Sequence, residues 1–170
     1  MSFVINPYFF QNVNVVKNGD FSNVSGMGVT GGGWYNNTPP SWVTESPNRN
    51  AGYSVLQLEG KYYANLNALS SSSVFQPLWQ NTVYSTSGSI FTATWTIRSL
   101  NGYPYTMGAA FYEEDAFDFP IATYTSPFDA NTRTVSLATP ALGPFALISF
   151  AMWQSGNTAP GVTDLTIYAS

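Results

Sequence analysis

Apolar and polar residues alternate most regularly between Ser89 and Arg98. From Phe91 onward every second residue is apolar or aromatic, and the residues between are threonines up to the final arginine. A period of two carried by β-branched and aromatic residues predicts a strand with one buried face. We therefore expect Phe91, Trp95 and Ile97 to lie in a core, with the threonines on the opposite face.

Shorter strand-like segments follow one another along the rest of the chain. The predicted strands are 13–17, 41–45, 53–58, 74–79, 89–98, 105–112, 121–124, 132–137, 145–153 and 165–168. Gly, Pro, Asn and Ser clusters separate them, and residues 18–35 are expected to be a loop. Short strands at regular spacing predict an all-β fold, an antiparallel β-sandwich with essentially no helix.

The composition narrows the possible functions. At 170 residues the chain has the size of one domain, and 44% hydrophobic residues supply a core. Only 8% of residues are charged, so the surface is expected to be polar but nearly uncharged. A net charge of −4 leaves no basic patch, which argues against nucleic-acid partners and against anionic membrane surfaces.

Two residue types are missing altogether, namely Cys and His. Their absence removes thiol nucleophiles, disulfides, structural zinc sites and His-based acid–base catalysis. No apolar run is long enough to span a membrane, so no membrane insertion is expected. The start of the chain does not read as a signal peptide, because no basic residue precedes Lys17 and Asn6-Pro7 interrupts the apolar stretch.

Two stretches at opposite ends of the chain form a recognisable pair. The first is Val-Asn-Val-Val-Lys-Asn-Gly-Asp-Phe at 13–21, followed by a Gly-rich loop and Trp34. The second is the alternating segment 161–168, which carries Asp164. The pair resembles the jelly-roll carbohydrate-binding modules of the galactose-binding-like superfold. The resemblance implies a jelly roll whose first and last strands lie together, with Trp34 packed under the opening loop.

The same resemblance implies a structural calcium ion between the opening motif and the last strand. This sequence departs from the family at two acidic positions, which are occupied by Ser22 and Thr163. Asp164 and Asp20 remain as candidate metal ligands. The alternative is that Asp164 is a solvated or hydrogen-bonded strand residue. The expected cofactor is therefore none or one calcium ion.

Aromatic residues beside amides and acids provide a second set of candidates. Sugar rings present flat C–H faces that stack on Trp or Tyr, while neighbouring polar groups bind the hydroxyls. The candidate ligand-binding residues are Trp153, Gln154, Trp79, Tyr112 and Glu113. For each of the aromatic residues, burial in the core is the alternative.

The segment 112–119 places four carboxylates in six positions. The plainest interpretation is a solvated turn, and a calcium or sugar contact comes next. Glycoside hydrolysis is the least favoured, because it needs two carboxylates facing each other across a cleft. We therefore expect no catalytic residues and no enzymatic activity.

Residues 1–12 form an apolar arm before the sandwich domain, which is expected to span 13–170. Its candidate docking residues are Phe3, Ile5, Tyr8, Phe9 and Phe10. The arm either packs on its own sheet or docks on a neighbour, because an exposed arm of this kind would aggregate. Docking would make the partner a second copy of the chain or another structural subunit.

Together these features predict a non-catalytic binding or structural sandwich displayed on a particle surface, such as a phage virion. There it would serve as a capsid decoration or tail-associated protein and contact host or environmental glycans. The alternative is a free-standing lectin or a secreted glycan-binding module.

Overall fold

The computed structural model describes residues 13–36, 38–44, 54–66, 73–78, 85–113, 120–154 and 159–170. These residues form strands β1 to β12 in two antiparallel sheets, and no α-helix occurs among them. The predicted all-β antiparallel sandwich is confirmed. None of the described residues forms a helix that is long and apolar enough to cross a membrane.

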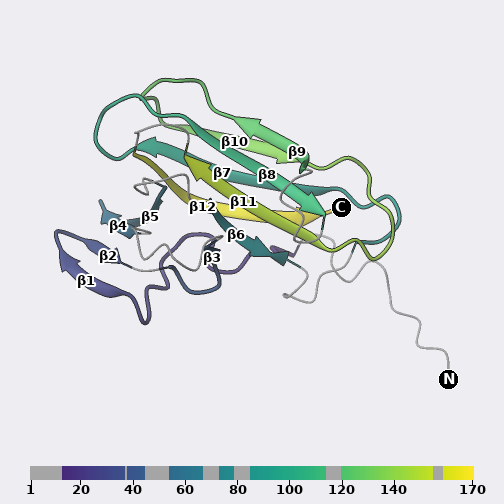
Figure 1. The fold of residues 1–170 in the computed structure, drawn as a ribbon, viewed down its shortest axis with the longest axis horizontal. Coiled ribbons are helices and arrows are strands. Elements are labelled where there is room, and N and C mark those ends of the chain that lie inside the picture. The colour runs from purple at the N-terminus through teal and green to yellow at the C-terminus, as the bar shows by residue number, and fades with distance from the viewer. Residues whose placement is uncertain are drawn as a thin grey trace.

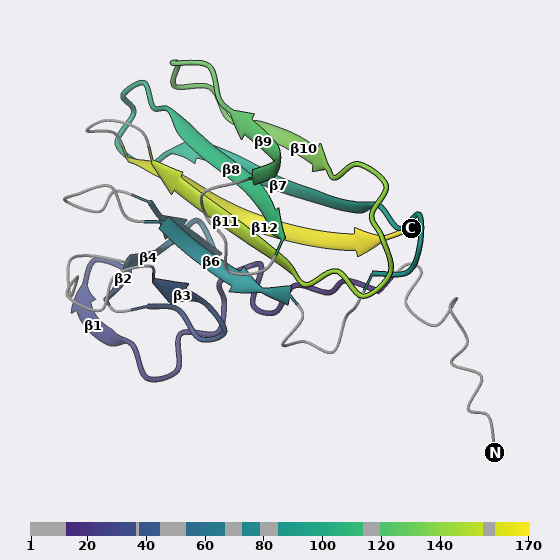
Figure 2. The same ribbon diagram turned by 45° about the vertical axis from the view of Figure 1, so that its right-hand side comes forward.

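The two sheets form two layers. Side by side, the strands of the seven-stranded sheet are β1 (Gly28–Gly31), β2 (Trp34–Asn36), β4 (Ser54–Leu58), β5 (Lys61–Asn65), β12 (Pro160–Ala169), β7 (Phe91–Ser99) and β10 (Arg133–Ala138). Those of the five-stranded sheet are β3 (Val43–Thr44), β6 (Ser73–Pro77), β11 (Ile148–Gln154), β8 (Met107–Glu113) and β9 (Pro120–Thr125). Figures 1 and 2 show β8 and β11 layered over β7 and β12, with β1, β2 and β4 gathered toward one end.

The core lies between these layers. Along β7, Phe91, Trp95 and Ile97 are buried, while the threonines between them are partly exposed. The Trp95 ring meets the Tyr124 ring edge-on, with centroids 5.3 Å apart, and lies 5.7 Å from the Phe150 ring of β11. Both contacts cross from one sheet to the other. The alternation in the sequence therefore identified the inner face of β7 correctly.

The two ends of the chain lie together. Asn14 pairs with Tyr168 in an isolated antiparallel bridge, and the Val15 N–H donates to the Ile167 carbonyl at 2.8 Å. Residues 13–17 were predicted to be a strand, but they make only this bridge. The Asn14 side chain explains the short pairing, because its Oδ1 accepts hydrogen bonds from both the Val16 and the Ile167 N–H groups.

A tryptophan does pack under the opening turn, but it is Trp42 rather than Trp34. The Trp42 ring stacks on the buried Phe21 ring at 5.2 Å, and its Nε1 donates to the Asn18 carbonyl at 3.1 Å. Trp34 instead lies half-buried on β2, where it pairs with Leu56. The expectation for Trp34 was therefore wrong.

Three strands were not predicted, because their sequences lack the alternating pattern of apolar and polar residues. β1 and β2 lie inside the segment expected to be a loop, and their hairpin turns on Gly31, Gly32 and Gly33, which all have positive φ. β5 follows the turn at Glu59 and Gly60, which also have positive φ. Strand pairing in the seven-stranded sheet, rather than the local sequence, holds these segments in place.

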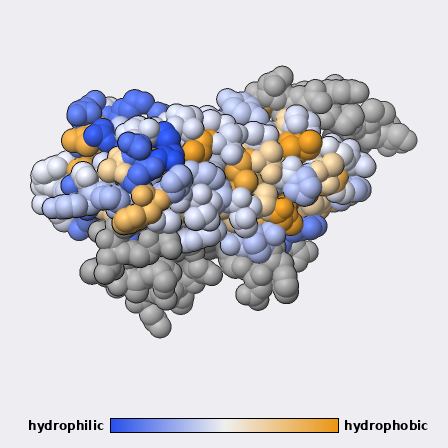
Figure 3. All heavy atoms as spheres, turned by 90° about the horizontal axis from the view of Figure 1, so that it is seen from above, coloured by the Kyte–Doolittle hydropathy of each residue, from blue (hydrophilic) through white to orange (hydrophobic). Residues whose placement is uncertain are grey.

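The described surface has few charges. Figure 3 shows strongly hydrophilic residues gathered toward one end, with pale residues and apolar ones over most of the rest. Charged residues make up only 8% of the chain.

Candidate functional site

The two faces of β8 and β11 pack into two separate groups of side chains. Phe111, Phe150 and Met152 face inward and belong to the main core. Because side chains alternate along a strand, the residues between them face away from it. They form a separate group, which we call the outer-face cluster: Ala110, Tyr112 and Ala151, with Trp153 packed against them.

Trp153 lies across the surface of the sheet. It is half-buried, and its cross-strand partner on β8 is Gly108. A Cβ atom built on Gly108 would lie 2.2 to 2.4 Å from three atoms of the indole ring. The ring therefore covers the Gly108 backbone, and only glycine leaves room for it at this position.

Ser149 is the buried polar residue of this face. Its cross-strand partner is Tyr112, and its side chain has no exposed surface. Its Oγ has no hydrogen-bond partner within the described part of the chain. Burial removes the water that would hydrate such a hydroxyl, and no protein hydrogen bond replaces that water, so its burial destabilises the fold.

The neighbouring strand β9 adds hydroxyl groups to the same face. Thr123 pairs with Ala110, and Thr125 pairs with Gly108. Both threonines are exposed, whereas Tyr124 between them packs on the main core. The outer face thus combines a flat indole ring, a tyrosine and exposed hydroxyls, without a charged side chain at the described outward positions of β8, β9 and β11.

The predicted ligand-binding residues do not all lie on this face. Trp153 and Tyr112 do, but Gln154 and Glu113 occupy the alternate positions, opposite Met107 and Ile148 on the core side. Gln154 is buried, and Glu113 is exposed at the strand end. Adjacent residues of a strand cannot share one face, so neither partner lies beside its aromatic neighbour.

Several other predictions concern segments outside the described residues. They are Trp79, the carboxylates after Glu113, and the docking residues Phe3, Ile5, Tyr8, Phe9 and Phe10. These stay predictions, as does the division of the chain at residue 12.

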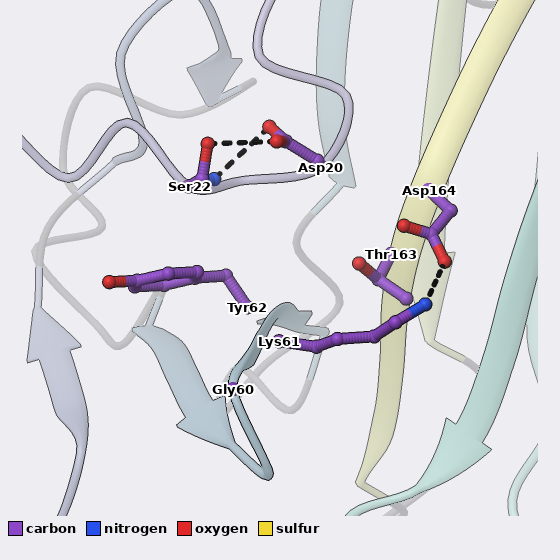
Figure 4. A pocket seen from close by; sticks show the side chains of 7 residues that line it. All are labelled: Asp20, Ser22, Gly60, Lys61, Tyr62, Thr163 and Asp164. Atoms are coloured by element: carbon purple, nitrogen blue, oxygen red, sulfur yellow. Dashed lines mark hydrogen bonds and ion pairs between the residues drawn. The ribbon is translucent and has the colours of Figure 1, made fainter.

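A pocket lies beside the opening turn. It has a volume of about 180 Å³ and is lined by Asp20, Ser22, Gly60, Lys61, Tyr62, Thr163 and Asp164. Figure 4 shows Asp20 and Ser22 on one wall and the Lys61 side chain extended toward Asp164. The Lys61 ammonium contacts the Asp164 carboxylate at 2.6 Å. That hydrogen bond and the negative charge raise the pKa of Lys61.

The pocket brings both predicted metal ligands together, but each carboxylate already has a partner. Asp20 accepts from the Ser22 N–H and from the Ser22 hydroxyl, while Asp164 binds Lys61. Calcium takes six to eight oxygen ligands, and an ammonium group beside one of two carboxylates opposes a second cation. No group of three or more acidic, His or Cys side chains among the described residues could hold a metal. The arrangement with Lys61 in place does not fit a calcium ion.

Sequence reasoning missed Gly108, Ser149 and Lys61. Gly108 did carry a signal, because a glycine inside a strand often marks a close approach by another group. Ser149 carried none, since nothing local distinguishes an unpaired serine from a paired one. Lys61 meets Asp164 across 103 positions of sequence, a contact that only the fold reveals.

Comparison with known proteins gives structural matches only. No protein-family model matches the chain, and no curated protein matches it. A cyclase from Fischerella sp. TAU, solved in complex with 4-(1H-indol-3-yl)butan-2-one, has a TM-score of 0.67 at 14% identity, covering 91% of this chain and 96% of the cyclase.

Carbohydrate-binding modules also share the architecture. TmCBM61, solved in complex with β-1,4-galactotriose, has a TM-score of 0.57 at 12% identity, covering 93% of this chain and 99% of the module. The xylan-binding CBM22-2 domain of Paenibacillus barcinonensis Xyn10C has a TM-score of 0.51 at 12% identity, covering 77% and 92%. At such identities the likeness concerns the fold. The chain thus has the β-sandwich fold of carbohydrate-binding modules, a fold that the cyclase shares.

Proposed function

We propose that this chain is a non-catalytic, glycan-binding β-sandwich whose ligand lies on the outer-face cluster. The observation that carries the proposal is the Trp153 indole, which is half-buried and lies flat over Gly108. One ring face covers the sheet, and we infer that the exposed part of the half-buried ring stacks on the ligand. The C–H face of a sugar ring is a suitable partner for such a platform.

The surroundings of Trp153 favour a neutral, hydroxyl-rich ligand. Thr123 and Thr125 place exposed hydroxyls beside the cluster. The outward positions of β8, β9 and β11 that the structure describes carry no charged side chain. A charged ligand would find no counter-charge there, whereas sugar hydroxyls would find donors and acceptors.

A small indole-bearing ligand is the second candidate. The observation in its favour is that the Fischerella cyclase, which was solved with such a molecule, matches 91% of this chain. A flat indole would also stack on Trp153. Catalysis is not part of the proposal, since the described outward positions supply no carboxylate to act as acid or base.

Display on a virion or other particle rests on the sequence alone, through the weakly charged surface and the apolar arm 1–12. We propose such display as an addition to the glycan-binding function. Deleting residues 1–12 should abolish assembly into a particle while leaving the sandwich folded, as measured by sedimentation and circular dichroism. Assembly by the truncated chain would contradict particle docking through the arm.

The glycan proposal is tested on a glycan array, run once with calcium and once with a chelator. The wild-type chain should bind, and Trp153→Ala should lose at least tenfold in affinity. Trp34→Ala is the matched control, because Trp34 is also half-buried but lies on β2 of the other sheet. Equal binding by wild type and Trp153→Ala would contradict the proposal. Binding of 4-(1H-indol-3-yl)butan-2-one without any glycan would favour the second candidate.

A further inference from the structure

The outer face contains one buried polar group that the described residues leave unpaired. The Ser149 hydroxyl is fully buried, and no described residue hydrogen-bonds with it. Other buried hydroxyls are paired: Ser85 Oγ donates to the Gly143 carbonyl at 2.6 Å, and Ser126 Oγ accepts from the Met107 N–H at 2.9 Å. Ser149 therefore differs from these serines, because it is the hydroxyl among the four buried polar side-chain atoms without a partner in the described part of the chain.

The other unpaired buried groups have different surroundings. Trp95 Nε1 lies in the core, where its ring meets two other aromatic rings. The Nε atoms of Arg98 and Arg133 belong to guanidinium groups that are already ion-paired with Glu59 and Asp129. Among the described residues, the unpaired hydroxyl on the outer face is that of Ser149.

We propose that the Ser149 hydroxyl forms a hydrogen bond with the bound glycan. The glycan would then provide the partner that Ser149 lacks among the described residues. This inference rests on the proposed function, because it places the ligand on the same outer-face cluster. A sugar hydroxyl meets the Ser149 Oγ, which both donates and accepts. Leaving this group unpaired in the free protein makes binding selective for a ligand with a hydroxyl at that point.

The distance between the two contacts sets the size of the ligand. Ser149 and Trp153 lie on one face of β11, four residues apart, with Ala151 between them. Four residues of strand span about 13 Å. This exceeds the width of one sugar ring, so a ligand that contacts both has at least two sugar units.

The ligand reaches Ser149 only after a side chain moves. Ser149 is buried, and the large side chain of its cross-strand partner Tyr112 belongs to the same cluster. The inference therefore requires that a side chain beside the hydroxyl, such as that of Tyr112, move away from the sheet when the glycan binds. Rotamer changes of this kind are common when a binding surface meets its partner.

Ser149→Ala separates this role from a structural one, because the two roles predict opposite changes. If the hydroxyl is unpaired in the free chain, its removal leaves the urea unfolding midpoint unchanged or raises it. Binding of β-1,4-galactotriose or xylohexaose, measured by calorimetry, should weaken about three- to tenfold through the loss of one hydrogen bond. Binding of free galactose or xylose should not change.

Ser126→Ala is the matched control, since it also removes a buried serine hydroxyl but one with a backbone partner. It should lower the unfolding midpoint and leave affinity unchanged when corrected for the folded fraction. A lower midpoint in Ser149→Ala would overturn the inference, whatever the sugars do. Unchanged oligosaccharide affinity in Ser149→Ala, with binding lost in Trp153→Ala, would overturn the inference alone. Unchanged affinity in both variants would overturn the proposed function as well.

Discussion

The outer-face cluster and the pocket beside the opening turn differ in whether their polar groups have hydrogen-bond partners. In the pocket, the Asp20 carboxylate binds Ser22 and the Asp164 carboxylate binds Lys61. In the cluster, the Ser149 hydroxyl has no partner among the described residues, and the Trp153 ring is half-buried. Paired polar groups stabilise the fold, whereas an unpaired hydroxyl on the same face as a half-buried aromatic ring can still bond to a ligand. This difference supports the proposed binding role of the cluster and a structural role for the pocket.

The largest effect is expected at Gly19, in the opening turn beside the pocket. A Cβ atom at this position would lie 2.0 Å from the Leu165 carbonyl oxygen, which is backbone and cannot swing away. The same two residues share a hydrogen bond, from the Leu165 N–H to the Gly19 carbonyl at 2.9 Å. Gly19→Ala should lower the free energy of unfolding by about 3 kcal/mol or more, as measured by urea denaturation.

Gly28→Ala is the control, because a Cβ atom on Gly28 meets nothing within 4 Å. Glycan affinity per folded molecule should be the same in both variants, since neither touches the cluster. A Gly19→Ala chain that is stable but no longer binds glycans would indicate that the ligand binds at the opening turn and not at the outer-face cluster.

A smaller effect on stability, but a larger one on binding, is expected at Gly108. Its added Cβ atom meets the Trp153 side chain, which can swing outward because it is half-buried. Gly108→Ala should therefore lower the free energy of unfolding by about 1 kcal/mol. Glycan affinity should fall at least tenfold, because the displaced indole no longer lies flat.

Gly143→Ala serves as the control for Gly108→Ala, since a Cβ atom on Gly143 also meets nothing within 4 Å. Titration calorimetry on both variants gives the comparison. Wild-type affinity in Gly108→Ala would show that the position of the Trp153 ring does not matter for binding.

The smallest effect is expected from Lys61→Met, because both partners of the ion pair are largely exposed to solvent. Asp164 raises the pKa of Lys61 above its ordinary value of 10.5. Because folding raises this pKa, the ion pair stabilises the fold fully at pH values below 10.5. The stabilisation is lost as the pH rises through the higher pKa of the folded state. The difference in unfolding midpoint between wild type and variant should shrink from pH 8 to pH 11.

The same variant tests the calcium prediction. With Lys61 in place, the ammonium group opposes a cation beside Asp164. Calcium should therefore raise the melting temperature of Lys61→Met more than that of the wild type. An equal or larger rise in the wild type would contradict a purely structural ion pair.

The sequence predicted the architecture well where the alternation was clean. β7 is such a segment, and the burial of Trp95 followed from its pattern. β8 and β11 are apolar at almost every position, so their sequences do not reveal which face meets the core. This explains why Trp153 and Gln154 were expected together although they lie on opposite faces.

The remaining differences come from contacts that no local pattern encodes. Trp34 and Trp42 both follow the Gly-rich loop, and only the stacking of Trp42 on Phe21 decides between them. The unpaired state of Ser149 likewise depends on everything around it. Such features belong to tertiary packing, which overrides local sequence preferences.

The indole N–H signals of the tryptophans test the central claim most directly. The chain has five tryptophans, so a 15N-labelled sample gives up to five indole signals, and Trp153→Phe identifies that of Trp153. Titration with a glycan that binds on the array should shift the Trp153 signal and leave the Trp34 signal in place. Saturable binding that shifts Trp34 and not Trp153 would contradict the assignment of the ligand to the outer-face cluster.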